Sequence, residues 1–346
     1  MRALLIKMSS MGDILHTFPA LTDLRRHRPD VELHWVVEKG FADMAAWHPA
    51  VERVIPITQR QWLRQRDRAS WRAWKAWRQD LRRERYDLVL DAQGLLKSGL
   101  IARQAHAAER HGFGGRSLRE KPAALFHGRS HDVLRSDEAP RELHAVEQNR
   151  RLFSQVFHYA LSGEPEFGVR QRFVDCRADS RSAPVILIPG TTWHTKHWVP
   201  AHWVTLARQL LDDGFAVEII WGSPEEQAMA RQIQAEAGAV EVADGRLSIP
   251  EVTQRLARAR AVIGPDTGFT HIAGALGTPS IALYGPTAPD QVGLIGRHTR
   301  NLTLNLDCAP CHKRDCKWLE QGSTAPPPCM RDLTAEQVYR TLKNLL

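Results

Sequence analysis

The chain has 346 residues, of which 43% are hydrophobic and 25% charged, and it carries a formal net charge of +8. This length is too great for one ordinary core and suits two domains. No apolar run approaches the ~20 residues of a membrane span, and Lys7 and Asp13 interrupt the apolar N-terminus. We therefore expect a cytoplasmic protein whose N-terminus is a first strand and not a signal peptide.

The first half of the chain alternates predicted strands and helices. Strands are expected at residues 3–7, 31–37, 53–57 and 88–91. Helices are expected at residues 13–26, 41–47, 70–85, 95–106 and 141–159. Residues 114–140 have little periodicity and read as loop and short helix, and a polar linker is expected at residues 161–183. This alternation is typical of a doubly wound α/β domain.

The most basic segment is residues 60–85, with ten Lys and Arg, three acids and four Trp. On a helix, Trp71, Trp74 and Arg78 share one face. A basic helix with interleaved Trp favours an anionic membrane surface or lipid head group. A solvated helix whose Trp side chains pack on the domain, and a nucleic-acid surface, stay open as alternatives.

The second half repeats the scheme. Strands are expected at residues 185–188, 216–221, 261–263 and 280–284, with helices at residues 202–212, 225–237, 250–259 and 267–276. Capping boxes at residues 248–251 and 334–337 open two helices. We expect two Rossmann-like α/β domains facing each other across a central cleft, at residues 1–165 and 180–330, followed by a C-terminal helix at residues 331–346.

Residues 261–276 predict a phosphate site. A buried strand breaks at Gly264-Pro265, and the helix that follows presents free backbone N–H groups and its positive end. Thr267, Gly268 and His271 fall in its first turn. The fitting ligand is a diphosphate.

Polar side chains follow three other predicted strands. Thr191, Thr192 and Lys196 can bind phosphate oxygens, although a plain turn would explain them alone. Glu226 can accept hydrogen bonds from ribose, or simply be an acid in the first turn of a helix. Asp13 follows the first strand, where α/β domains place ligands, and its alternative role is a helix N-cap. The chain has no Asp-x-Asp, so a nucleotide-sugar enzyme built from it would stabilise its leaving diphosphate without a divalent ion.

Four of the five cysteines lie near the C-terminus, at positions Cys308, Cys311, Cys316 and Cys329. Four thiolates with one C-x2-C pair could hold a structural zinc ion. The spacing lacks the second C-x2-C of a zinc ribbon, so reduced cysteines or local disulfides are the alternative. In either case we expect a structural role and not a catalytic one.

Taken together, these motifs resemble the type I heptosyltransferases of lipopolysaccharide synthesis, which belong to glycosyltransferase family 9. The similar segments run in order along nearly the whole chain: residues 7–17, 35–38, 47–56, 91–95, 144–147, 191–192, 196–198, 221–222, 266–268 and 284–287. The cysteine segment departs from the best-known type I proteins and looks more like segments of other members of the broader family, type II-like members included. Residues around Arg60 match only loosely.

The resemblance implies a GT-B fold and an inverting glycosyltransferase that needs neither metal nor cofactor. The implied donor is ADP-L-glycero-D-manno-heptose and the implied acceptor is Kdo-lipid A, at the inner face of the inner membrane, with no nucleic-acid partner. Asp13 matches the general base. The donor positions are Thr191, Thr192, Lys196, Glu226, Leu247, Asp266, Thr267, Gly268 and His271. The acceptor positions are Ser10, Arg60, Arg64, Lys97 and Arg119. A type II-like enzyme acting on heptosyl-Kdo-lipid A is the first alternative, and a zinc-bearing nucleic-acid binder is the second.

Overall fold

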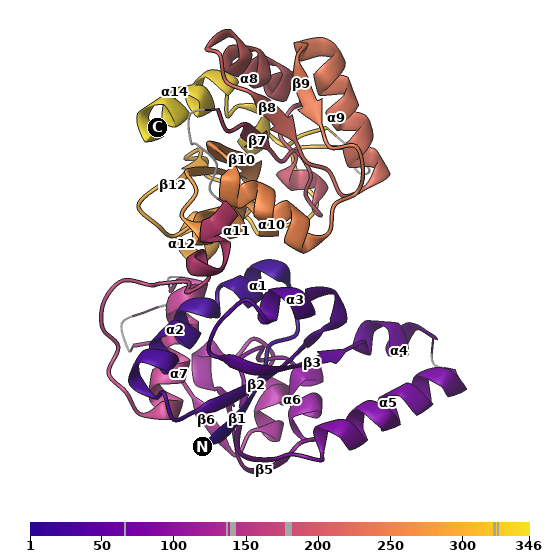
Figure 1. Ribbon diagram of the computed structural model, residues 1–346, viewed down its shortest axis with the longest axis vertical. Coiled ribbons are helices and arrows are strands. Elements are labelled where there is room, and N and C mark those ends of the chain that lie inside the picture. Colours follow the sequence, from indigo (N-terminus) through magenta and orange to yellow (C-terminus); the bar gives the residue numbers. More distant parts are fainter. Residues whose placement is uncertain (66, 136–137, 139–142, 177–181, 321–322, 324) are drawn as a thin grey trace. The chain divides into compact units, whose positions relative to one another are not determined.

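The first half of the chain builds a six-stranded parallel sheet in the order β3-β2-β1-β4-β5-β6 (Figure 1). Its strands are β1 (Arg2–Ile6), β2 (Glu32–Glu38), β3 (Val51–Ile57), β4 (Arg85–Asp91), β5 (His106–Phe113) and β6 (Arg129–His131). The strand order reverses between β1 and β4. The carboxyl ends at such a switch point are where open α/β sheets bind ligands.

The second half builds another six-stranded parallel sheet, in the order β12-β11-β10-β7-β8-β9. Its strands are β7 (Val185–Leu187), β8 (Val217–Ile219), β9 (Val240–Val242), β10 (Ala261–Pro265), β11 (Ser280–Tyr284) and β12 (Thr299–Thr303). Its switch point lies between β7 and β10, which pair in parallel. The α/β class and the doubly wound order of both halves are as expected.

Two compact units result, Met1–Val169 and Arg170–Leu346. The computed structural model describes residues 1–65, 67–135, 138, 143–176, 182–320, 323 and 325–346, without the side chains of residues 60, 63 and 174–176. In that part of the chain no helix combines the length and the apolar content needed to cross a membrane.

The helices of the first unit are α1 (Met11–Leu15), α2 (Phe18–His27), α3 (Ala42–Ala45), α4 (Gln59–Gln65), α5 (Arg68–Leu81), α6 (Leu96–Ala102) and α7 (Ala145–Phe157), with 3-10 turns η1 (Lys39–Phe41), η2 (Gly115–Ser117) and η3 (Lys121–Phe126). The expected single helix at residues 13–26 is wrong. Thr17 opens a second helix with Pro19 in its first turn, and proline suits that position because it lacks the N–H that a helix interior needs.

The helices of the second unit are α8 (Pro200–Asp212), α9 (Pro224–Ala237), α10 (Ile249–Arg258), α11 (Gly268–Leu276), α12 (Pro289–Val292), α13 (Pro328–Arg331) and α14 (Ala335–Leu345), with 3-10 turns η4 (Arg170–Cys176) and η5 (His194–Lys196). Both expected capping boxes are present, at Ser248 and at Thr334. They satisfy backbone donors that the first turns of α10 and α14 would otherwise leave open.

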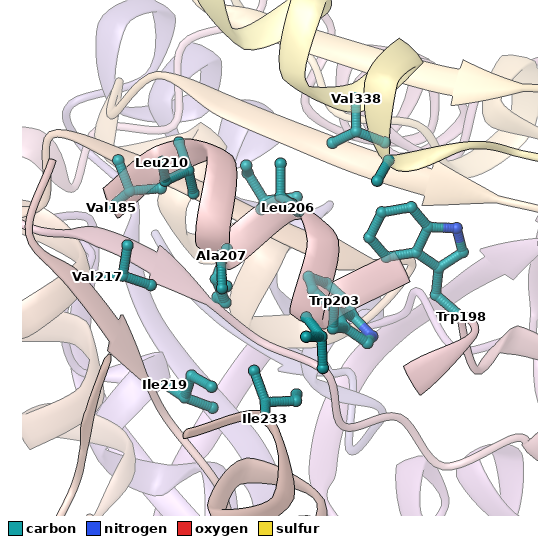
Figure 2. Packing of buried hydrophobic residues seen from close by; sticks show 14 of the residues in the cluster. Val185, Trp198, Trp203, Leu206, Ala207, Leu210, Val217, Ile219, Ile233 and Val338 are labelled. Atoms are coloured by element: carbon teal, nitrogen blue, oxygen red, sulfur yellow. The ribbon is translucent and has the colours of Figure 1, made fainter. Parts of the chain in front are cut away.

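The core of the second unit is built around two tryptophans (Figure 2). Trp198 and Trp203 are fully buried and meet edge to face, with ring centroids 4.8 Å apart. Trp198 also donates its indole N–H to the Leu333 carbonyl at 2.7 Å. Val338 and Leu342 of α14 complete the same core, so the C-terminal helix packs on this unit.

Candidate functional site

Lys196 and Asp266 meet at the switch point of the second sheet. Lys196 ends η5, which follows β7, and Asp266 directly follows β10. The Lys196 Nζ lies 2.6 Å from the Asp266 Oδ2, with 12% and 10% of the two side chains exposed. A cation of this kind, at the carboxyl end of a central strand, is suited to an anionic ligand.

Asp266 organises this edge through two further partners. His271 Nε2 lies 3.0 Å from its Oδ1, and the Thr287 hydroxyl donates to its Oδ2 at 2.7 Å. Burial works against the charged carboxyl group, but the His271 hydrogen bond and the Lys196 charge outweigh it and hold the pKa of Asp266 below its ordinary value. The site therefore keeps a fixed carboxylate that orients Lys196 and His271.

The predicted helix terminus is present beside this carboxylate. Thr267 is the N-cap of α11, with no hydrogen bond from its side chain to the helix, and Gly268 is the first helical residue. His271 lies in the opening turns, since α11 begins at Gly268. The end of β10 packs closely on the first turn of α11, because a side chain at Gly264 would press on the Thr270 hydroxyl and on Ile188. A helix N-terminus of this kind presents backbone N–H groups that suit an anion.

The remaining donor candidates come from the connections after β7, β8 and β9. Thr191 is half-buried and Thr192 exposed, and neither hydroxyl has a hydrogen-bond partner among the described residues. The Glu226 carboxylate accepts from the Gly222 N–H at 2.7 Å and packs so closely on Gly190 that any side chain there would collide with it. Leu247 is half-buried in the loop between β9 and α10. All lie after carboxyl ends of strands of one sheet.

Two residues of this site were not among the predicted site residues. Thr287 follows β11 and binds Asp266, as described above. The Trp193 ring lies under the Lys196 ammonium, 4.6 Å from ring centroid to Nζ. The signal for Thr287 was in the sequence, because it follows the predicted strand at residues 280–284, next to β10. Trp193 lies in a short irregular segment, so no strand or helix pattern in the sequence predicts its position.

In the first unit, Asp13 and Ser10 lie after β1, and the Arg119 side chain reaches Asp13 from the segment between η2 and η3. Its Oδ2 accepts from the Ser10 N–H at 2.9 Å and from the Ser10 hydroxyl at 3.0 Å. Its Oδ1 lies 3.2 Å from the Arg119 Nη2. Asp13 is thus not the N-cap of α1, the alternative weighed from the sequence. Ser10 is the N-cap, and Asp13 is the third helical residue of a capping box.

A buried lysine stands behind this carboxylate. Lys7 is 3% exposed and donates from Nζ to the Ala92 carbonyl at 2.7 Å. Burial lowers the pKa of Lys7 to about 8, although the Asp13 charge opposes that shift. For Asp13, burial favours the neutral form, but Lys7 and Arg119 outweigh it, so the pKa of Asp13 lies well below its ordinary value.

The loop that carries Asp13 is tied to the loop after β4. The Gln93 side-chain oxygen accepts from the Met8 N–H at 2.9 Å and from the Ser9 N–H at 3.3 Å. The Oδ1 of the fully buried Asp91 accepts a hydrogen bond from the Gln93 N–H at 2.9 Å. The Gln93 and Asp91 side chains thus hold the loop after β1, which leads to Asp13, against the loop after β4.

The other acceptor candidates follow strands of the same sheet, and within the described residues neither Lys97 nor Arg64 forms a hydrogen bond or ion pair with Asp13. Lys97 is half-buried in the first turn of α6, which follows β4. Arg64 is exposed in α4, which follows β3. Arg60 lies in the same helix, but its side chain is outside the described residues. The structure thus joins Ser10, Asp13 and Arg119, and leaves the roles of the other three as predictions.

The four C-terminal cysteines are free thiols that line one cavity together with Thr195, Pro286 and Lys313. Burial, and then the neighbouring thiols, raise the pKa of Cys329 to about 11. Across the described ranges, no three His, Cys, Asp or Glu side chains form a group that could hold a metal ion. The described cysteines form no disulfide, and their structural role stays a prediction.

The cysteine loop also braces the segments around Lys196. The Thr195 hydroxyl donates to the Lys313 carbonyl at 3.2 Å, and the His312 N–H donates to the Pro286 carbonyl at 2.7 Å. Arg314 lies over Trp193, 5.1 Å from its ring centroid. These contacts support the segments that carry Lys196 and Thr287.

Comparison with known proteins finds heptosyltransferases as relatives of this chain. Residues 74–321 match the model of glycosyltransferase family 9 (heptosyltransferase). Lipopolysaccharide heptosyltransferase 1 of Pseudomonas aeruginosa is 40% identical over 100% of this chain and 98% of its own. The structure of Escherichia coli heptosyltransferase WaaC with ADP is 34% identical over the full length of both chains, with a TM-score of 0.86. Lipopolysaccharide heptosyltransferase 2 of E. coli is 32% identical, over 48% of each chain.

Proposed function

Because this chain belongs to glycosyltransferase family 9, the heptosyltransferases, we propose that it transfers L-glycero-D-manno-heptose from ADP-heptose to Kdo of lipid A, in the inner core of lipopolysaccharide. The observation that carries the proposal is the buried Lys196–Asp266–His271 group beside the N-terminus of α11. This group provides a cation, a histidine and free N–H groups at one sheet edge, which is what a nucleoside diphosphate needs.

Donor binding follows from the second unit. The diphosphate is held by Lys196, the Thr191 and Thr192 hydroxyls and the Thr267–Gly268 terminus. Glu226 accepts from ribose hydroxyls, and Leu247 packs beside the adenine. The same E. coli enzyme has also been solved with ADP-2-deoxy-2-fluoro heptose, and that chain superposes on this one with a TM-score of 0.84 at 34% identity. This likeness supports ADP-heptose as the donor.

Catalysis uses groups of opposite charge. Asp13 takes the proton from the attacking Kdo hydroxyl as the oxygen bonds to the anomeric carbon. Attack comes from the face opposite ADP, so the configuration at that carbon inverts. Negative charge grows on the departing diphosphate, where Lys196, the threonine hydroxyls and the α11 N-terminus stabilise it. Because the protein's own groups stabilise this negative charge, the reaction needs no divalent ion.

Acceptor binding is assigned to the first unit. Arg119 and Ser10, which surround Asp13, are joined by Arg60, Arg64 and Lys97 in binding the anionic Kdo. The full-length similarity to type 1 enzymes, against half-length similarity to type 2, favours Kdo-lipid A over heptosyl-Kdo-lipid A. We place the enzyme on the inner face of the inner membrane, where a lipid-linked acceptor is available.

Acceptor competition tests this assignment. With both acceptors at equal concentration and ADP-heptose limiting, heptose should appear on Kdo-lipid A at least tenfold faster. A preference for heptosyl-Kdo-lipid A would replace the assignment with the type 2 activity.

A further inference from the structure

The strongest feature outside the transfer site is one face of α5. The helix begins after Asp67, whose carboxylate accepts from the Ser70 N–H at 2.7 Å. Its inner side is set by the buried Leu81 and by Trp77, which meets Trp62 edge to face at 6.0 Å. Trp62 and Trp77 pack against the core of the first unit. The opposite side of α5 therefore faces away from the core.

Two further tryptophans, the exposed Trp71 and the half-buried Trp74, lie on a flank of α5 beside that inner side. Trp71 has 59% of its surface exposed and meets Trp74 edge to face, with centroids 5.1 Å apart. Lys75 lies over the Trp71 ring at 5.8 Å, and Arg78 lies over the Trp74 ring at 5.6 Å. Because residues three and four apart are neighbours on a helix, these four side chains form one aromatic and cationic stripe.

Among the described residues, the cations of this stripe, and the neighbouring Arg72 and Arg82, lack acidic partners. Lys75, Arg78 and Arg82 line one hollow together with Gln79. Asp80 is the one carboxylate within α5, and it already forms ion pairs with Arg53 at 2.9 Å and with Arg83 at 3.4 Å. In the described part of the chain no carboxylate lies within ion-pair distance of Arg72, Lys75, Arg78 or Arg82, and the buried Arg78 Nε has no hydrogen-bond partner. This surface presents several uncompensated cations.

We propose that the solvent-facing surface of α5, formed by Trp71, Arg72, Lys75, Arg78 and Arg82 with the half-buried Trp74 beside them, docks on an anionic lipid bilayer surface. The basic side chains meet the phosphate groups of the lipids, and the exposed Trp71 ring enters the interface between head groups and acyl chains, where tryptophan is favoured. In Figure 1 this helix lies at the rim of the first unit. This docking goes beyond the transfer reaction and would hold the enzyme at the surface that carries its lipid-linked substrate.

A nucleic-acid surface fits these contacts less well. Single-stranded nucleic acid stacks its bases on open aromatic faces. Here the two rings stand at 85° to each other, and a cation of the same helix lies over each of them. The ring edges and the exposed Trp71 indole are thus available for insertion into a bilayer interface. The flat ring faces on which bases would stack are largely covered.

The test is co-sedimentation of the full chain with vesicles of pure phosphatidylcholine and with vesicles of equal parts phosphatidylcholine and phosphatidylglycerol. The wild type should bind the anionic vesicles, and more weakly as salt rises. One variant removes the α5 cations: Arg72→Gln, Lys75→Gln, Arg78→Gln and Arg82→Gln. Because each basic residue near an anionic surface adds several-fold to binding, this variant should bind at least tenfold more weakly.

Two further variants separate docking from net charge and from misfolding. The matched control removes four exposed cations of the second unit: Arg208→Gln, Arg231→Gln, Arg258→Gln and Arg297→Gln. It should bind within twofold of wild type. Trp71→Ser, which removes an exposed ring and keeps the charge, should weaken vesicle binding by severalfold.

Two results would overturn the proposal. They are unchanged vesicle binding of the α5 charge variant and an equal loss of vesicle binding in the control. Vesicle binding needs neither ADP-heptose nor Kdo-lipid A, so its failure would leave the transferase proposal standing. Transfer to a de-acylated, water-soluble acceptor should be normal in every variant, which also shows that each one is folded.

Discussion

Arg119 and Asp13 form an ion pair in the first unit, with the Arg119 Nη2 3.2 Å from the Asp13 Oδ1. The guanidinium is half exposed, at 53% of its side-chain surface, while Asp13 keeps 23%. A base held by a cation is a weak base, because the cation favours the ionised carboxylate. An anionic acceptor that draws Arg119 toward itself would therefore strengthen Asp13 as the proposed base.

Arg119→Gln should change both binding and pH dependence. Loss of a charge-assisted contact to the acceptor should raise its KM by about tenfold. Because Arg119 lowers the pKa of Asp13, its removal should move the acid limb of the kcat/KM profile to higher pH. Lys121→Gln, which removes an exposed cation two residues away, is the control. An unchanged acid limb and KM would show that the ion pair plays no part in the reaction.

Lys196→Ala should weaken ADP binding by at least tenfold, because the ammonium would otherwise meet a diphosphate at a mostly buried site. Thr287→Val keeps the side-chain shape but removes the hydroxyl that donates to Asp266, and it should weaken ADP binding by a smaller factor. Calorimetric titration with ADP measures both, with Thr205→Val on α8 as the control. Wild-type affinity in Lys196→Ala would remove Lys196 from the donor site.

His48 predicts a pH-dependent loss of stability in the first unit. The Ala50 N–H donates to its Nδ1 at 3.1 Å, so its Nε2 carries the proton and donates to the Thr22 hydroxyl at 3.0 Å. Burial, and then the Arg25 charge, lower the pKa of His48 to about 3. The unfolded chain thus takes up a proton below the ordinary pKa of about 6.5, while the folded chain does not.

Stability should therefore fall as the pH drops below about 6.5. Between pH 6.5 and pH 5 the His48 contribution is about 2 kcal/mol. Urea unfolding at pH 7 and at pH 5 should show a smaller difference in His48→Gln than in wild type. The exposed His298→Gln should behave as wild type. If wild type and His48→Gln lost the same stability on acidification, the buried neutral histidine would not be its cause.

The cysteine cluster is predicted to stabilise the fold and not to act in catalysis. Cys308→Ser with Cys311→Ser should lower Tm by about 2–4 °C for each kcal/mol of packing lost. The kcat of the remaining folded enzyme should change much less. Thermal melts and initial rates, with elemental analysis for metal, measure these effects. A double variant that melts like wild type yet has lost turnover would reverse the assignment.

The buried strands of both sheets were predictable, because their apolar runs are bounded by turn residues. The missed strands were β5, β6, β9 and β12. β5 reads His-Ala-Ala-Glu-Arg-His-Gly-Phe, and β9 has only three residues. Polar or very short strands at or near a sheet edge acquire their conformation from pairing with a neighbour, which local sequence does not encode.

The candidate site likewise has parts that the sequence predicts and contacts that it does not. Asp266, Thr267 and Gly268 were predictable because a strand, a tight turn and a helix stand in order in the sequence. The contact of Lys196 with Asp266 was not, because 70 residues separate them and only the strand order brings β7 beside β10. Likewise, Arg119 reaches Asp13 across 106 residues from an irregular segment.

The most direct test of the proposed function is incubation of the chain with ADP-heptose and Kdo-lipid A, with and without EDTA, followed by mass spectrometry. Wild type should add one heptose at the same rate in both conditions. Asp13→Ala should lower kcat by about 10²–10⁴-fold while ADP-heptose affinity stays nearly unchanged. Absence of heptosylated product with wild type, or more than a tenth of wild-type kcat in Asp13→Ala, would contradict the proposed transfer or its base.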